Sequence, residues 1–247
     1  MPAPETLLLA ALITTATYSV FGLTGAGSTV IALPLIAHFL PLKFAVTLLL
    51  LLDLAASLAL STRARGVVRM DEFGRLLPFL LAGLVLGLTL LIQAPEGPLL
   101  TTLGVFLLAY AAWSLARKPG EIHLSRAWAA PFGLAGGALA ALFGTGGVLT
   151  TLYFAGRLSR KDELRATAST AVLVNSVTRV ALFGATGLLT RDVLLSGLLL
   201  LPSVAVGLFV GQRLHALVDA GSVRRAVYVV LLLAGVSLLV RYASFLK

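Results

Sequence analysis

The sequence predicts an all-α integral membrane protein built from two inverted repeats, each with a glycine-broken or re-entrant helix pair followed by three spanning helices. Three observations lead to this fold class. Hydrophobic residues make up 59% of the 247 positions and charged residues only 12%, with a mean hydropathy of +1.01, far outside the range of a soluble domain. A glycine-rich segment occurs twice, and most basic residues fall on one side of the expected topology.

Apolar runs of about 20 residues, long enough to cross a bilayer, alternate with short polar connections. No stretch remains for a folded domain outside the membrane. The first run lacks a basic n-region, which favours a mature helix over a cleaved signal peptide. We assign residues 1–120 to repeat 1 and 121–247 to repeat 2 of one membrane domain. The expected helices are 5–22, 28–40, 43–62, 72–93, 97–116, 125–143, 147–156, 164–185, 192–214 and 222–245.

Glycine-rich segments interrupt the apolar sequence at residues 21–28 (FGLTGAGS) and 141–147 (ALFGTGG). Glycine clusters at membrane depth expose backbone N–H groups, which persist only where they line a protected cavity. Their duplication indicates a transporter. The alternative is that these glycines simply permit close helix packing.

Proline and glycine positions also repeat in the later helices. A proline followed by two glycines at the same spacing occurs at residues 78–87 and again at 202–211, about 124 positions further on. Met70-Asp71 lies opposite Arg191-Asp192 in the repeat, where the matching helices begin. The shared spacing indicates a duplication, although Gly and Pro are frequent in membrane helices in general.

Residues 5–40 are too long for a single crossing. As one helix at about 1.5 Å per residue they would reach roughly 54 Å, whereas the hydrocarbon core is about 30 Å thick. The segment therefore crosses twice or folds back, and in both cases the chain returns to the side on which it started. Each repeat then crosses the membrane an odd number of times in total, so the second repeat is inverted relative to the first. This topology places both termini outside.

The distribution of the basic residues supports this odd number of crossings per repeat, according to the positive-inside rule. Fourteen lie on one side and four on the other. A single-crossing topology with parallel repeats would divide the same charges almost evenly, so the rule favours inverted repeats. The larger group is Arg63, Arg65, Arg69, Arg75, Arg117, Lys118, Arg126, Arg157, Arg160, Lys161, Arg165, Arg213, Arg224 and Arg225, and the smaller is Lys43, Arg191, Arg241 and Lys247.

The glycines at positions 22, 25 and 27 followed by Pro34, their counterpart at 143–147, and the Pro/Gly spacing of the later helices resemble the sulfite exporter TauE/SafE family over nearly the whole chain. The resemblance implies an exporter of small sulfur-containing anions, such as sulfite or sulfonates, in the plasma membrane. Two positions depart from the pattern. Ser28 stands where the family often has a third glycine, and Tyr153 stands where the first repeat has Pro34.

The glycine breaks also favour an anionic substrate on physical grounds. A helix that starts at Ser28 or Gly147 presents its first N–H groups and the positive end of its dipole to the break, and two such ends related by a pseudo-two-fold axis would converge on one site. Nearby hydroxyls add donors for oxyanion oxygens, unless they bond to their own backbone. The expected site residues at the breaks are Gly25, Gly27, Ser28, Thr29, Gly144, Gly146, Gly147, Thr150 and Thr151.

Arg179 lies within the apolar stretch 171–188, where a guanidinium costs about 3 kcal/mol on insertion scales. Asn175 precedes it by one helical turn on the same face, so the pair is placed to clamp an oxyanion, with bidentate contacts from the arginine. The alternatives are an arginine that snorkels to the outer interface or a structural ion pair with Asp53.

Asp53 lies in the middle of a spanning segment, opposite Asn175 in the repeat. An isolated carboxylate in hydrocarbon would take up a proton, so Asp53 is a candidate proton carrier, a counter-ion for Arg179, or an ordinary structural partner. His38, just before Pro41, is a second candidate for proton coupling, although a histidine there is more often interfacial.

Charged clusters at residues 63–72 and 157–163 are expected to set the topology and contact anionic lipid headgroups, or to gather an anionic substrate. The positive-inside bias explains the net charge of +9 without nucleic acid. The absence of cysteine excludes disulfides, thiolate metal sites and thiol catalysis. With no Walker loop, metal cluster or nucleophile–base pair in the sequence, we expect neither an enzyme nor a cofactor.

These features together predict a secondary transporter in the plasma or inner membrane that exports a small sulfur-containing anion by alternating access around a midplane site, coupled to a proton gradient or the membrane potential. Its partners would be the anion and membrane lipids. A homo-oligomer is also compatible with the sequence. A passive anion channel explains the same features except Asp53. A membrane scaffold or enzyme explains only the helices.

Overall fold

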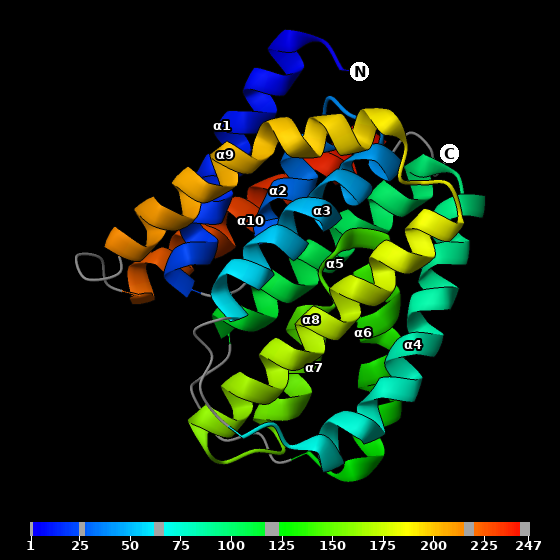
Figure 1. The fold of residues 1–247 in the computed structure, drawn as a ribbon, viewed down its shortest axis with the longest axis vertical. Coiled ribbons are helices and arrows are strands. Elements are labelled where there is room, and N and C mark those ends of the chain that lie inside the picture. Colours follow the sequence, from blue (N-terminus) through cyan, green and yellow to red (C-terminus); the bar gives the residue numbers. More distant parts are fainter. Residues whose placement is uncertain (1, 25–27, 62–66, 117–123, 215–219, 243–247) are drawn as a thin grey trace. The chain divides into compact units, whose positions relative to one another are not determined.

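The structure is a computed structural model that describes residues 2–24, 28–61, 67–116, 124–214 and 220–242 (Figure 1). Its described part is helical, and six helices are long and apolar enough to cross a membrane. The all-α membrane fold class is thereby confirmed. The helices are α1 (Pro4–Thr24), α2 (Ser28–Ile36), α3 (Leu42–Ser61), α4 (Met70–Gln93), α5 (Glu96–Ala116), the 3₁₀ turn η1 (Arg126–Trp128), α6 (Ala129–Phe143), α7 (Gly147–Ala155), α8 (Lys161–Ala185), α9 (Arg191–Leu214) and α10 (Ala220–Tyr242). The six are α1, α3, α4, α5, α8 and α9.

The largest difference from the expected boundaries concerns the helix expected at residues 28–40. It ends at Ile36 and passes into turns through residue 40, where the N–H of Phe39 donates to the carbonyl of Ile36 at 3.1 Å. Pro41 follows, and the residue before a proline disfavours the helical conformation. At nine residues, α2 reaches only about 13 Å, too short to cross a bilayer by itself.

The chain forms two compact units. Unit 1 consists of Met1–Leu52, Gln93–Lys118 and Thr190–Lys247, and unit 2 of Asp53–Ile92 and Pro119–Leu189. Unit 1 therefore contains α1, α2, α5, α9, α10 and the first half of α3. Unit 2 contains the rest of α3 together with α4, η1, α6, α7 and α8.

In unit 1, α1 packs closely on α9 because glycine leaves room for the facing backbone. A Cβ on Gly207 would collide with the Thr15 carbonyl and the Ser19 amide, and one on Gly211 would overlap the Ser19 carbonyl. Residue numbers increase along both helices in these contacts, so α1 and α9 run parallel. Close approach through small residues is the usual means of helix association in membranes.

In unit 2, α4 packs on α6 through the repeat-related glycines. A Cβ on Gly83 would collide with the Leu134 carbonyl and the Ala138 amide, and one on Gly87 would overlap the Ala138 carbonyl. These helices also run parallel. The fourth helix of each expected repeat thus packs on the first helix of the other, with the same contacts in both units.

The segment α6–α7 is a hairpin that returns to the level where it began. At one end of the hairpin, the N–H of Leu124 donates to the carbonyl of Gly156 at 3.0 Å, and Leu124 packs on the Gly156 backbone. At the turn, Gly146 leaves no room for a Cβ against the Gly136 carbonyl. The second broken pair therefore folds back rather than crossing once.

Candidate functional site

The turn of the α6–α7 hairpin is built by local glycine chemistry. Gly144 has φ +70°, a left-handed conformation that glycine adopts without steric cost. The N–H of Gly144 donates to the Ala140 carbonyl at 2.9 Å, which is the αL ending of a helix, and the N–H of Thr145 donates to the Leu139 carbonyl at 3.3 Å. Helix α7 then begins at Gly147.

The start of α7 lies against α8. A Cβ on Gly147 would be 3.6 Å from the side chain of Val172, which precedes Asn175 by about one turn and Arg179 by two. Arg179 is 2% exposed and Asn175 is 9% exposed. Arg179 is thus buried inside unit 2, and it does not extend to the outer interface as one alternative required.

Three buried side chains in this region carry polar atoms with no hydrogen-bond partner among the described residues. They are Oγ1 of Thr145, Oδ1 of Asn175, and both Nε and Nη2 of Arg179. Leaving a buried donor or acceptor without a partner costs about 1–3 kcal/mol. Thr145 was not among the residues expected from the sequence, because a threonine between glycines carries no local signal that its hydroxyl is buried.

The guanidinium of Arg179 has two further neighbours. Its Cζ lies 5.5 Å from the centroid of the Phe183 ring, a side chain that is fully buried. The half-buried Asp53 of α3 interacts with it electrostatically. The structure therefore brings Asp53, Asn175 and Arg179 together in unit 2, an arrangement in which Asp53 could serve as the counter-ion for Arg179.

The hydroxyls expected at the breaks have different surroundings. Thr150 is buried, and its Oγ1 donates to the Gly147 carbonyl at 3.1 Å, which is the local bonding considered as the alternative. Thr151 is exposed. Ser28 and Thr29 are buried at the start of α2 in unit 1, while Gly25 and Gly27 lie outside the described residues.

His38 follows α2 in unit 1. Its Nδ1 is 2.6 Å from the Pro34 carbonyl and its Nε2 is 3.0 Å from Oγ of Ser237 on α10. Arg241 donates to the His38 carbonyl at 2.9 Å. Both ring nitrogens are thus engaged within unit 1, and the role of His38 in proton coupling stays a prediction.

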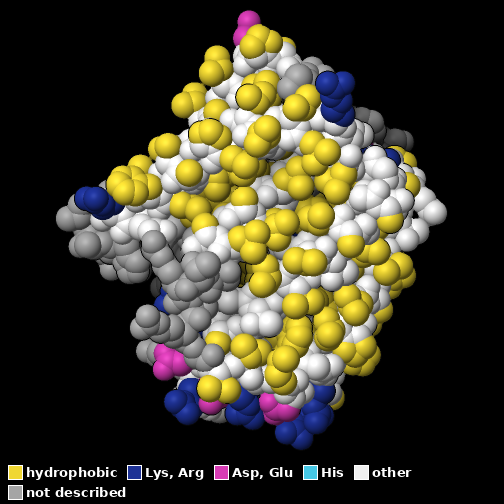
Figure 2. All heavy atoms as spheres, viewed as in Figure 1, with side chains coloured by type: hydrophobic (Ala, Val, Ile, Leu, Met, Phe, Trp, Pro, Cys, Tyr) yellow, Lys and Arg dark blue, Asp and Glu magenta, His cyan; other side chains and the backbone are white. Residues whose placement is uncertain are grey.

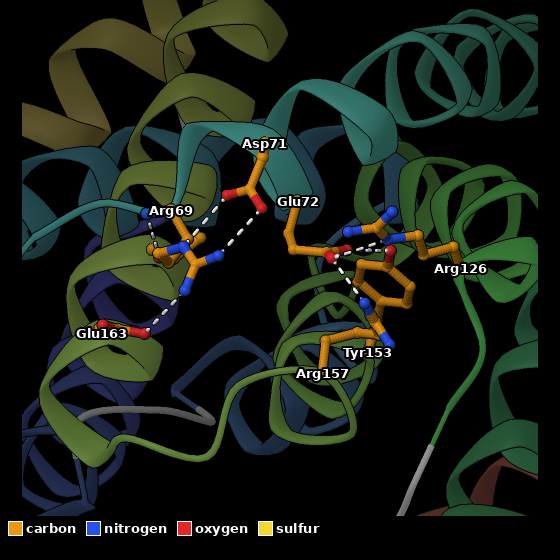
Figure 3. A network of polar contacts seen from close by, with 8 residues as sticks. Arg69, Asp71, Glu72, Arg126, Tyr153, Arg157 and Glu163 are labelled. Atoms are coloured by element: carbon orange, nitrogen blue, oxygen red, sulfur yellow. Dashed lines mark hydrogen bonds and ion pairs between the residues drawn. The ribbon is translucent and has the colours of Figure 1, made fainter.

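A second polar centre surrounds Glu72, in the first turn of α4 (Figure 3). Its carboxylate is 3% exposed. Tyr153 of α7 donates to Oε2 at 2.8 Å, Arg157 donates to Oε1 at 2.7 Å, and Nε of Arg126 lies 3.6 Å from the same oxygen. Bonding to this carboxylate raises the pKa of Arg157, whose second terminal nitrogen donates to the Leu124 carbonyl at 3.0 Å.

Charged side chains gather near this centre, at the lower end of the view in Figure 2, where α4 and α8 begin. The sequence led us to assign the charges here to topology and lipid contact. Arg157 differs from that interpretation, because its side chain is 23% exposed and turned to Glu72. The missed signal was Tyr153, the departure from Pro34 in the first repeat.

Comparison with known proteins places the chain clearly. The sequence model of a family described as "Sulfite exporter TauE/SafE" matches residues 9–238. A protein of Comamonas testosteroni described as "Probable inner membrane transporter protein TsaS" is 30% identical over 200 residues, covering 77% of this chain and 81% of that protein. No solved structure matches the chain significantly.

Proposed function

The chain belongs to the sulfite exporter TauE/SafE family of membrane transporters, and on that premise we propose that it is a secondary transporter that exports a small sulfur-containing anion of the sulfite or sulfonate type. It is a multi-pass membrane protein and not an enzyme. The observation that carries the proposal is the buried Arg179 guanidinium, whose Nε and Nη2 have no partner among the described residues.

The two nitrogens identify the part of the guanidinium that is available. Nε–H and the neighbouring Nη2–H point in the same direction and form the side-on fork that contacts two oxygens of one oxyanion. Sulfite and sulfonates present such oxygen pairs. Thr145 supplies a hydroxyl donor. Asn175, one turn before the arginine on α8, would contribute through the N–H groups of Nδ2, since its unpartnered Oδ1 is an acceptor.

Asp53 is the proposed coupling residue. Its negative charge balances Arg179 when no anion is bound, and an arriving anion competes for the same cation. Protonation of Asp53 would remove this competition, because two negative groups near one buried cation are costly. The protonation state of Asp53 would then control the affinity of the site for the anion. His38 remains the weaker candidate for this role.

Inverted repeats are supported by helix directions. In unit 1, Gly104 of α5 lies at Gly235 of α10, and Leu108 also reaches Gly235. Tyr110, later in α5, contacts Tyr228, earlier in α10, with 6.1 Å between ring centroids. The last helices of the two repeats thus run antiparallel, as inverted repeats require and parallel repeats do not. Inverted repeats are the architecture on which alternating access is commonly built, and we include alternating access and external termini in the proposal.

The proposal is tested with purified protein in proteoliposomes. A panel of sulfite, thiosulfate, sulfoacetate and simple carboxylates is offered, and we expect transport of sulfur oxyanions in preference to carboxylates. Dependence on an imposed pH gradient identifies a coupled carrier, whereas flux that follows only the membrane potential identifies a channel. Transport of carboxylates in preference to every sulfur oxyanion would contradict the proposed substrate class.

A further inference from the structure

The end of helix α7 is attached to the start of α4 by the buried carboxylate of Glu72. Tyr153 is on the last turn of α7, and Arg157 lies two residues beyond its end. Both donate to Glu72, at 2.8 and 2.7 Å. The two donors therefore converge on one carboxylate.

The start of α4 is attached to α8 by a separate set of contacts (Figure 3). Nε and Nη2 of Arg69 donate to Asp71 at 3.1 and 3.0 Å, and Nη1 donates to Glu163 of α8 at 3.3 Å. The backbone N–H of Arg69 donates to Oγ1 of Thr167 at 3.0 Å. The Glu72 contacts can therefore break while α4 stays anchored to α8.

Helix α7 connects this centre to the proposed anion site. Its first residue, Gly147, follows Thr145 at the glycine turn, and its last turn carries Tyr153. The nine residues between the two ends span about 13 Å. A helix this short moves as a unit, so a displacement at the glycine turn changes the distance from Tyr153 to Glu72.

Such a movement of α7 would expose a buried apolar cluster next to the Glu72 contacts. Tyr153 and Phe154 belong to a buried cluster that also contains Ala171 of α8 and Leu158. Ala171 is 1% exposed. Separation of the end of α7 from this cluster would expose Ala171, so the accessibility of position 171 reports on that separation.

We propose that Glu72, acting through Tyr153 and Arg157, is a latch that holds α7 closed and is released and re-formed in each transport cycle. The part of this proposal that concerns the cycle rests on the proposed transport function. The latch itself is a property of unit 2. A permanent structural anchor would use the same contacts but would not respond to a substrate.

The test uses single cysteines, since the chain has none of its own. Ala171→Cys is the reporter, and Ala111→Cys, buried in α5 of unit 1, is the matched control. The rate of labelling by a membrane-permeant maleimide is measured with and without Glu72→Gln. We expect labelling at position 171 to accelerate roughly tenfold or more and labelling at position 111 to stay the same. Tyr153→Phe, which removes one hydrogen bond, should act in the same direction and less strongly.

The substrate arm distinguishes a latch from an anchor. Sulfoacetate is added to the Ala171→Cys protein with Glu72 intact, because sulfite itself adds to maleimides. Hydrogen exchange of residues 147–160 provides the parallel measurement with sulfite. We expect the anion to accelerate labelling and exchange, and Arg179→Gln to remove this response.

Unchanged labelling at position 171 in a folded Glu72→Gln protein would overturn the latch, as would an equal increase at position 111. An increase at position 171 with Glu72→Gln but no response to an anion that the protein transports would identify a permanent anchor and overturn the latch, whereas transport of no anion of the panel would refute the proposed substrate. The two failures are therefore distinguishable.

Discussion

Gly104 of α5 and Gly235 of α10 lie face to face, and a Cβ on either would come within 3.1 Å of the other's carbonyl oxygen. One glycine lies in the last helix of each expected repeat, and the helices that carry them run in opposite directions. The direction of α10 relative to α5 decides between inverted and parallel repeats, and it leads directly to a topology experiment.

Single-cysteine labelling with an impermeant maleimide should place Ser125 and Ser159 on the same side of the membrane and Thr190 on the opposite side. All three are exposed. The expectation follows because α6 and α7 form a hairpin closed by the Leu124–Gly156 hydrogen bond, while α8 then crosses once. If Ser125 and Ser159 are labelled from opposite sides, the hairpin and the inverted repeats are both wrong.

Gly87→Ala should lower the free energy of unfolding by about 1–3 kcal/mol, the usual cost of overpacking. The added Cβ would lie 2.5 Å from the Ala138 carbonyl oxygen, and backbone cannot move aside as a flexible side chain can. Gly74→Ala is the control, since nothing lies within 4 Å of its Cβ position. Thermal unfolding in detergent measures both. Equal melting temperatures would show that α4 and α6 tolerate a wider separation.

The sequence predicted the helix breaks and the close helix contacts because both depend on glycine, whose effect on the backbone is local. Gly144 was located from the sequence for this reason. The two units could not be predicted, since they exchange helices between the repeats and depend on long-range packing. The Glu72 centre was missed because its partners, Tyr153 and Arg157, lie more than 80 positions away, and a carboxylate at a helix start is ordinarily explained by the helix dipole.

Arg179→Gln should weaken oxyanion binding about a hundredfold without unfolding the protein, since loss of a charged partner in a buried site costs a few kcal/mol. Arg179→Lys retains the charge but not the side-on fork of Nε and Nη2, so it should also bind poorly. Isothermal titration or a thermal-shift series with the transported anion gives the affinities. Near-normal affinity in a folded Arg179→Gln protein would place the substrate elsewhere.

Asp53→Asn should abolish the dependence of transport on the pH gradient while leaving anion binding measurable, because the amide keeps the shape of the side chain but does not titrate. Transport is measured in proteoliposomes with an imposed gradient of pH and then of potential alone. His38→Gln is the companion variant for the second candidate. A pH-gradient dependence that survives Asp53→Asn would assign this aspartate a structural role beside Arg179.

Thr145→Val should raise stability and lower anion affinity at the same time. The Thr145 hydroxyl is buried without a partner among the described residues, so replacing it by a methyl group of similar size removes a desolvation cost of about 1–3 kcal/mol. If that hydroxyl donates to the bound oxyanion, its loss removes one hydrogen bond, worth about 1 kcal/mol, and affinity falls roughly fivefold.

Thr14→Val provides the matched control, because the Thr14 hydroxyl is also buried and has no partner in the described part of the chain, but it belongs to α1 in unit 1 and not to unit 2. It should raise stability and leave affinity unchanged. Thr150→Val removes a hydroxyl already bonded to the Gly147 carbonyl, so its effect on affinity should be smaller than that of Thr145→Val. Melting temperatures with and without anion measure all three variants. If Thr145→Val gains stability and keeps full affinity, its hydroxyl does not contact the anion, and the site is confined to α8.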